Sequence, residues 1–135
     1  RYTVVDAPRV PMSVARVLAE TSETVFVVLQ PTVKDVRVAK SILGSLTAAG
    51  IPRERLRPVL NRCGRHQMVS EAEIRKVLGD VTIGRLSNDY SSAIRGGNYG
   101  KVLAEAAPRS TLRKEVAELA TEVAGAYSGN GRHKH

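Results

Sequence analysis

"TVFVVLQPTVKDVRVAKSILGSLTAAG", residues 24–50, decides the fold class because it joins two elements of different periodicity. Its first six residues form an unbroken apolar run, which is typical of a strand buried on both faces of a parallel sheet. After Pro31, apolar residues recur at spacings of three and four, which predicts a helix over 33–49 that stops at Gly50. The stretch therefore predicts a strand followed directly by a helix.

The rest of the chain continues this alternation. Short apolar runs predict further strands, and helical composition or capping residues predict further helices. Alternating strands and helices indicate right-handed β-α-β units, so we expect an α/β fold with a mostly parallel sheet and helices on both faces. The expected strands are 2–5, 24–29, 56–61 and 81–86, and the expected helices are 12–20, 33–49, 70–78, 89–95 and 110–127.

Two helices carry further signals. Ser70 and Glu73 form a capping box at the start of one, and Gly96 with Gly97 is expected to stop the helix that begins at Asp89.

The last helix places apolar residues on one face and mixes acidic with basic residues on the other, so we expect it to pack on the domain rather than on an anionic membrane. Its apolar face is Leu112, Val116, Leu119, Ala120 and Val123, and its acidic residues are Glu115, Glu118 and Glu122. Residues 128–135 have no apolar anchor and are expected to form a disordered tail.

Composition limits the class of protein. The chain has 135 residues, 42% of them hydrophobic, which suits one domain with its own core. Because it has no membrane-length apolar run, no secretory signal pattern and a single cysteine, Cys63, we expect a soluble cytoplasmic protein. The formal charge of +8 favours anionic partners. Its arginines are scattered, however, so a solvated surface explains them as well as a binding face: Arg37, Arg53, Arg55, Arg57, Arg62 and Arg65.

Ligands of parallel α/β sheets bind at the carboxyl ends of the strands. That rule selects Asp6, Gln30, Asn61 and residues 87–89. A carboxylate such as Asp6 suits a magnesium ion, held directly or through water, but it suits a loop cap equally well. An amide such as Asn61 offers the donor and acceptor that read adenine, although strand-end asparagines also simply form turns.

Other site types are not supported. The glycine-rich stretch 95–102, RGGNYGKV, lacks both the first glycine and the Ser or Thr of a phosphate loop, so we interpret it as a helix stop and turn. No histidine lies at metal-ligand spacing from a cysteine or carboxylate, which argues against zinc. Ser91, Ser92 and Cys63 lack the setting of a catalytic nucleophile.

Several stretches taken in order resemble the carboxyl-terminal part of the MinD/ParA family of P-loop ATPases. They are VVDAPR, VFVVLQPTVKDVRVAK, PVLNR, VSEAEIRKVLG and IGRLSNDYSSAIRGGNYGKVL, together with the closing helix, and they cover about residues 2–124. Because DAPR is close to the D-L-P-R form, the chain looks most like the CpaE or TadZ branch, which serves Flp/Tad pilus and type II/IV secretion systems. The resemblance implies a partial P-loop NTPase fold in residues 1–127.

The resemblance also implies roles for individual residues. Asp6 matches the Walker B acid, which is expected to bind magnesium through a water, and Pro8 and Arg9 match the switch that senses the terminal phosphate. Asn61 matches the adenine-contacting asparagine, and Arg62 follows it in the same motif. Ser87, Asn88 and Asp89 match the I-P-x-D strand end against the base, with Ser87 in place of proline; Ala93, Asn98 and Gly100 match a structural turn.

The lysine-bearing Walker A loop of that family is not in this sequence, so we expect it upstream. The resemblance implies ATP and magnesium in the complete protein, no tight nucleotide binding or hydrolysis by residues 1–135 alone, and a dimer that localises pilus or secretion proteins. It places the protein in the cytoplasm, at the cell pole or the inner-membrane face, with membrane association through partners. Two alternatives stay open: a ParA-type ATPase that binds DNA nonspecifically, and an interaction module that keeps the fold without using nucleotide.

Overall fold

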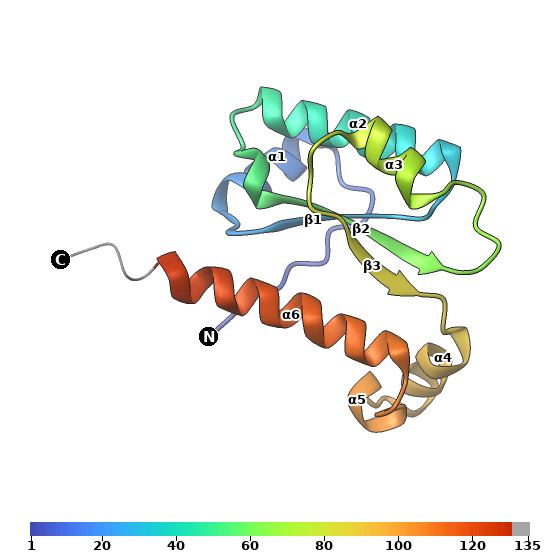
Figure 1. Cartoon of the computed structure of the whole chain (residues 1–135). Helices are drawn as coiled ribbons and strands as arrows, with labels where there is room; N and C mark the ends of the chain where they lie inside the picture. The colour runs from blue at the N-terminus through green and yellow to red at the C-terminus, as the bar shows by residue number, and fades with distance from the viewer. Residues whose placement is uncertain (131–135) are drawn as a thin grey trace.

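Three parallel strands form one sheet in the order β1-β2-β3, with helices on both of its faces (Figure 1). The structure is a computed structural model that describes residues 1–130, with side chains as far as Gly125. Helices α1, α2 and α3 lie on one side of the sheet and α6 crosses the other side, which confirms the predicted α/β arrangement. The strands are β1 (Val25–Leu29), β2 (Leu56–Cys63) and β3 (Gly84–Ser87), and the helices are α1 (Met12–Thr21), α2 (Val33–Ala48), α3 (Glu71–Leu78), α4 (Tyr90–Tyr99), α5 (Leu103–Ala106) and α6 (Thr111–Asn130), with a 3-10 turn η1 (Arg53–Arg55) before β2.

The main core lies between the sheet and helices α2 and α3. Alternate residues of β2, Leu56 and Leu60, are buried there, and so are Leu46 of α2 and Ile74 of α3. These positions follow the strand period of two and the helix period of 3.6, because only one face of each element meets the core. The sequence periodicity therefore identified the buried face of α2 correctly. The prediction that the apolar run at 24–29 is buried on both faces is wrong, because Phe26 and Val28 on one face of β1 are 40% and 60% exposed.

Local capping explains where two of these helices begin. The Thr32 hydroxyl accepts the amide of Asp35 at 3.1 Å and starts α2, while Gly50, at a φ of 92°, follows its end. The predicted capping box is present in α3, since Ser70 and Glu73 each accept the backbone amide of the other. The Ser70 hydroxyl, which donates to Glu73 Oε2 at 2.7 Å, and the Ser70 amide lower the pKa of the Glu73 carboxyl because they stabilise its charged form.

Two arginines of η1 tie helices to the start of β2. Arg55 donates to the carbonyl oxygens of Ala19, at 2.6 Å, and of Ser22, at the end of α1. Arg53 donates to the carbonyl oxygen of Leu78, at 2.8 Å, at the end of α3. A cation at a helix carboxyl end satisfies free carbonyls and complements the helix dipole. Both arginines therefore serve the fold rather than a binding surface.

Helix α6 rests on the second face of the sheet at Gly84. A Cβ atom at this glycine would lie 2.9 Å from Leu119 Cδ2 of α6 and 3.3 Å from Val59 Cγ2 of β2. Leu119 thus packs as predicted, but Val116 and Ala120 of the expected apolar face are exposed. The helix is rotated because two acidic residues expected to face solvent turn toward the sheet: Glu122 pairs with Arg57 and Glu115 with Arg85.

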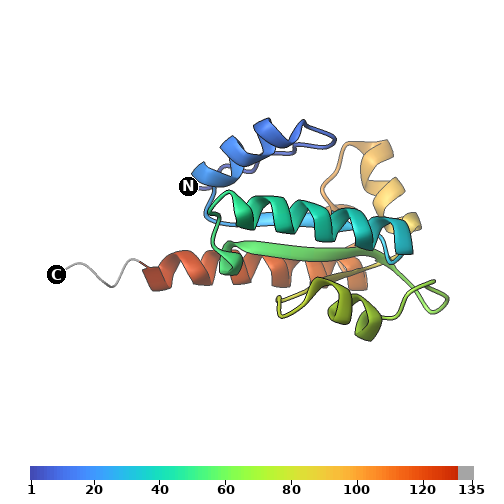
Figure 2. The ribbon, with the colours of Figure 1, turned by 90° about the horizontal axis from the view of Figure 1, so that it is seen from above.

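The prediction of a strand at residues 2–5 is wrong. This segment belongs to no strand, and Val4 is 92% exposed. Its β-branched residues favour extended backbone, but a strand needs hydrogen bonds to a neighbouring strand, and no strand of the described chain pairs with it. Figure 2 shows the segment, in dark blue, running beyond the β1 side of the sheet before it turns back into α1.

The helix at Asp89 does not stop at Gly96 and Gly97 as predicted. It continues to Tyr99 and ends at Gly100, which is left-handed, with hydrogen bonds from Lys101 to Gly96 and from Gly100 to Gly97. Gly96 is required for a different reason, since a Cβ atom there would meet the Lys101 carbonyl oxygen at 2.9 Å.

The bounds of two other elements also differ from the prediction. Strand β3 begins at Gly84 rather than at residue 81, and α6 includes residues 128–130 of the expected tail. Residues 131–135 of that tail lie outside the described residues.

Candidate functional site at the carboxyl ends of the strands

The carboxyl ends of β2 and β3 meet at one edge of the sheet. Because all three strands are parallel, Leu29, Cys63 and Ser87 end their strands at this edge. The amide of Asn88 donates to the carbonyl oxygen of Cys63 at 2.8 Å, so the segment after β3 stays attached to β2. The structure therefore brings together the predicted residues 61–62 and 87–89.

A β-bulge shapes the end of β2. Leu60 pairs with Arg85 and Cys63 pairs with Ser87, so two residues, Asn61 and Arg62, stand opposite one. The Asn61 side-chain oxygen accepts the Arg62 amide at 2.9 Å, and Arg62 adopts a φ of 58°. Strand β2 ends at Cys63, two residues beyond the predicted end at Asn61. The bulge places the exposed Arg62 at the sheet edge.

Ser87 is bound to α6 by its backbone and its side chain. Its amide donates to Glu115 Oε2 at 2.6 Å and its hydroxyl donates to Glu115 Oε1 at 2.7 Å. Arg85 Nη1 lies 3.5 Å from the same Oε1 atom, and the Glu115 side chain is only 15% exposed. Sequence reasoning missed Glu115, although Glu115, Leu119 and Glu122 share one helical stripe that could have indicated it.

Asp89 caps helix α4. Its Oδ1 atom accepts the amide of Ser92 and the hydroxyl of Ser91, both at 3.1 Å. The hydrogen bonds from Ser92 lower the pKa of the Asp89 carboxyl, because they favour its ionised form. Its observed contacts are those of a helix cap, whereas the neighbouring Asn88 side chain is exposed.

The other predicted residues come from the first strand and the N-terminal segment. The amide of Gln30 donates to Asp35 Oδ2 at 3.2 Å, so it serves the start of α2. Asp6 and Arg9 are exposed, and across the described chain no hydrogen bond or ion pair links them to residues 61–62 or 87–89. The turn that contains Pro8 lies on the α4 side of the molecule, toward the strand carboxyl ends (Figure 2).

Backbone strain coincides with two predicted positions. Within residues 1–130, Arg9 and Arg62 are the non-glycine residues with positive φ, at 56° and 58°. Left-handed backbone costs a residue with a Cβ atom roughly 1–2 kcal/mol, and such outliers concentrate at functional sites. Both strained residues are arginines in motifs that the family resemblance links to nucleotide: Arg9 lies in the switch motif, and Arg62 follows Asn61 in the adenine motif.

The described residues suit magnesium only in a limited way. No group of three or more His, Cys, Asp or Glu side chains in the described part could hold a metal ion. Magnesium commonly takes one or two carboxylates and completes its shell with water and phosphate oxygens, so the lone Asp6 fits that donor chemistry. Cys63 is buried, and this burial raises the pKa of its thiol and disfavours the thiolate form.

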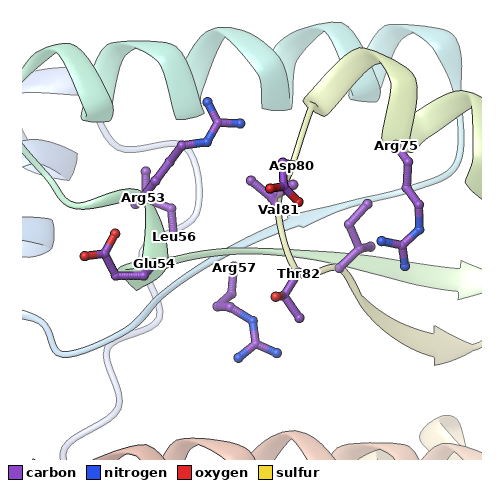
Figure 3. A pocket seen from close by; sticks show the side chains of 9 residues that line it. Arg53, Glu54, Leu56, Arg57, Arg75, Asp80, Val81 and Thr82 are labelled. Carbon is purple, nitrogen blue, oxygen red and sulfur yellow. The ribbon is translucent and has the colours of Figure 1, made fainter.

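A pocket of about 540 Å³ lies at the opposite end of the sheet, near the amino ends of β2 and β3 (Figure 3). Three arginines line it, but each already has a partner: Arg53 binds the Leu78 carbonyl, Arg57 pairs with Glu122, and Arg75 pairs with Glu71. Glu54 and Asp80 add negative charge to the same walls. This pocket therefore has neither the position nor the free cations of the predicted site.

Comparison with known proteins supports the α/β fold and its similarity to the fold of ParA family ATPases. No protein-family model matches the chain, and no curated protein matches it in a sequence search. A solved structure, the crystal structure of a ParA family ATPase from Chlorobium tepidum TLS, is similar with a TM-score of 0.70 and 25% sequence identity. The match covers 80% of this chain and 45% of that chain, so this chain spans less than half of the neighbour's length. The chain thus has part of a ParA-like P-loop NTPase fold.

None of the helices in the described range combines the length and the apolar character that crossing a bilayer requires.

Proposed function

We propose that this chain is the carboxyl-terminal part of an ATPase domain of the MinD/ParA type, and that the edge with residues 61–62 and 87–89 faces bound ATP. The observation that carries the proposal is the convergence of these residues at the carboxyl ends of β2 and β3, in a fold similar to a ParA family ATPase. Ligands of open α/β sheets bind at that end. In the proposed complex, Asp6 holds magnesium through a water, Arg9 lies near phosphate, and Asn61 contacts adenine.

We further propose the role of the CpaE or TadZ branch for the complete protein. In that role, nucleotide-dependent dimerisation in the cytoplasm localises Flp/Tad pilus or secretion proteins, at the cell pole or the inner-membrane face. The support is the sequence DAPR at residues 6–9. Arg9 has strained backbone immediately after Ala7-Pro8, which is consistent with a built switch rather than a plain surface turn.

Sedimentation velocity of the complete natural protein with Mg-ATP tests this proposal. The wild type should dimerise with Mg-ATP and stay monomeric without nucleotide, while Asp6→Ala and Asn61→Ala should abolish the shift. Asp80→Ala is the matched control, since this exposed acid lies at the opposite end of the sheet. Indifference of the dimer to both site variants would instead support a module that keeps the fold without nucleotide use.

The charge of +8 favours a second candidate, nonspecific DNA binding by a ParA-type ATPase. The structure reduces the cations available for it, because Arg53, Arg55 and Arg57 bind groups within the fold. DNA binding by the complete protein that weakens steeply with salt, and that fails without ATP, would favour this candidate over the pilus role.

A further inference from the structure

The segment after β3 is held by contacts from three directions. The Asn88 amide binds the Cys63 carbonyl of β2, and the Asp89 side chain caps α4. From the third direction, Glu115 of α6 accepts both the amide and the hydroxyl of Ser87. Of these contacts, those from Glu115 join the segment to the long C-terminal helix, which also pairs Glu115 with Arg85, packs Leu119 on Gly84 and pairs Glu122 with Arg57.

The contact between Glu115 and Ser87 restrains a backbone position that serine itself does not fix. In the I-P-x-D pattern that this segment resembles, a proline stands at Ser87, and its ring fixes φ and removes the N–H. Serine leaves φ free and adds an N–H that is partly buried here and needs an acceptor. Glu115 supplies that acceptor through short, charge-assisted hydrogen bonds.

We propose that Glu115 is a positioning residue that fixes residues 87–89 where the base of a bound nucleotide lies. This inference rests on the proposed function and adds to it a residue outside the motifs that suggested nucleotide binding. Glu115 does not itself reach the base; it acts through Ser87 and so sets the shape of one wall of the site. Loss of Glu115 should therefore weaken discrimination between bases more than it weakens binding of phosphate.

The test measures binding of mant-ATP and mant-GTP, each with magnesium, to the complete natural protein. Wild type should prefer mant-ATP. Glu115→Ala should lower mant-ATP affinity by about tenfold, because it removes both charge-assisted hydrogen bonds that hold Ser87, and should reduce the preference over mant-GTP. Glu118→Ala, an exposed acid on the same helix, should change neither value. Circular dichroism checks folding, and Glu115→Gln, which keeps one acceptor oxygen, serves if the alanine variant is unfolded.

A rescue variant separates positioning from a general structural role. The Ser87 amide donates to Glu115 and not to a neighbouring strand, so Ser87→Pro removes no strand hydrogen bond. In the pair Ser87→Pro/Glu115→Ala the ring should fix the segment again, and mant-ATP preference should return toward wild type. Amide hydrogen exchange of Asn88 and Asp89 should accelerate in Glu115→Ala and slow again in the double variant.

Three results would overturn the inference. If wild type prefers mant-ATP and Glu115→Ala keeps both the affinity and the preference, Glu115 does not position the segment, and the proposed function stands. If the double variant fails to recover the preference while remaining folded, the role of Glu115 is general stability. If wild type binds neither nucleotide, the proposed function fails first and this inference fails with it.

Discussion

Replacing Gly84 with valine should loosen helix α6 from the sheet. A Cβ atom at this position lies 2.9 Å from Leu119 Cδ2 and 3.3 Å from Val59 Cγ2, so both neighbours must shift. Overpacking of this kind costs about 1–3 kcal/mol. Removing a glycine from a strand returns roughly 0.5–1 kcal/mol. We therefore expect Gly84→Val to lower the free energy of unfolding by about 1–2 kcal/mol.

Urea unfolding followed by far-ultraviolet circular dichroism measures this change. Adding Leu119→Ala removes the nearest contact atom, so the double variant should lose less stability than the sum of the single variants, by at least about 0.5 kcal/mol. Gly44→Ala is the control: nothing lies within 4 Å of its added Cβ atom, and an exposed helix position should gain stability. A Gly84→Val protein as stable as wild type, or strict additivity with Leu119→Ala, would refute the close packing of α6 on β3.

Two further predictions concern the caps. The pKa of the Asp89 carboxyl is lowered, so its contribution to stability is present above the unfolded-state pKa and is lost as the pH falls through the folded-state value. Below about pH 4, the melting temperature of Asp89→Asn, which keeps the cap acceptor, should therefore fall less steeply with pH than that of wild type. Equal slopes for the two proteins would argue against the cap. Arg55→Met should cost about 1–3 kcal/mol and speed amide exchange at the end of α1, because it removes the donors to the Ala19 and Ser22 carbonyls. Arg37→Met, an exposed control, should change neither property.

Features encoded by neighbouring residues could be predicted from the sequence. The capping box of Ser70 and Glu73 depends on a spacing of three residues, and the helix after Thr32 depends on an apolar period, so both are visible in the chain itself. The carboxyl-end rule then placed Asn61 and residues 87–89 at one edge because it needs only parallel strands. That part of the candidate site followed from local pattern and topology.

Features that depend on distant contacts could not be predicted in this way. Glu115 and Glu122 were expected to face solvent because they are charged, yet they pair with Ser87, Arg85 and Arg57 of the sheet. The segment 2–5 has the composition of a strand, but its state depends on whether another strand lies beside it.

The bulge at Arg62 likewise follows from how β2 and β3 pair rather than from either strand alone. Two residues of β2 stand opposite one of β3 there, and no period within residues 56–63 reveals that mismatch.

Amide chemical-shift mapping of Mg-ATP on the complete natural protein decides where nucleotide lies. We expect the largest changes at Arg62, Asn88 and Asp89, at the carboxyl ends of β2 and β3. Changes confined to Arg57 and Thr82, which line the pocket at the opposite end, would contradict the proposed site, and so would the absence of any change.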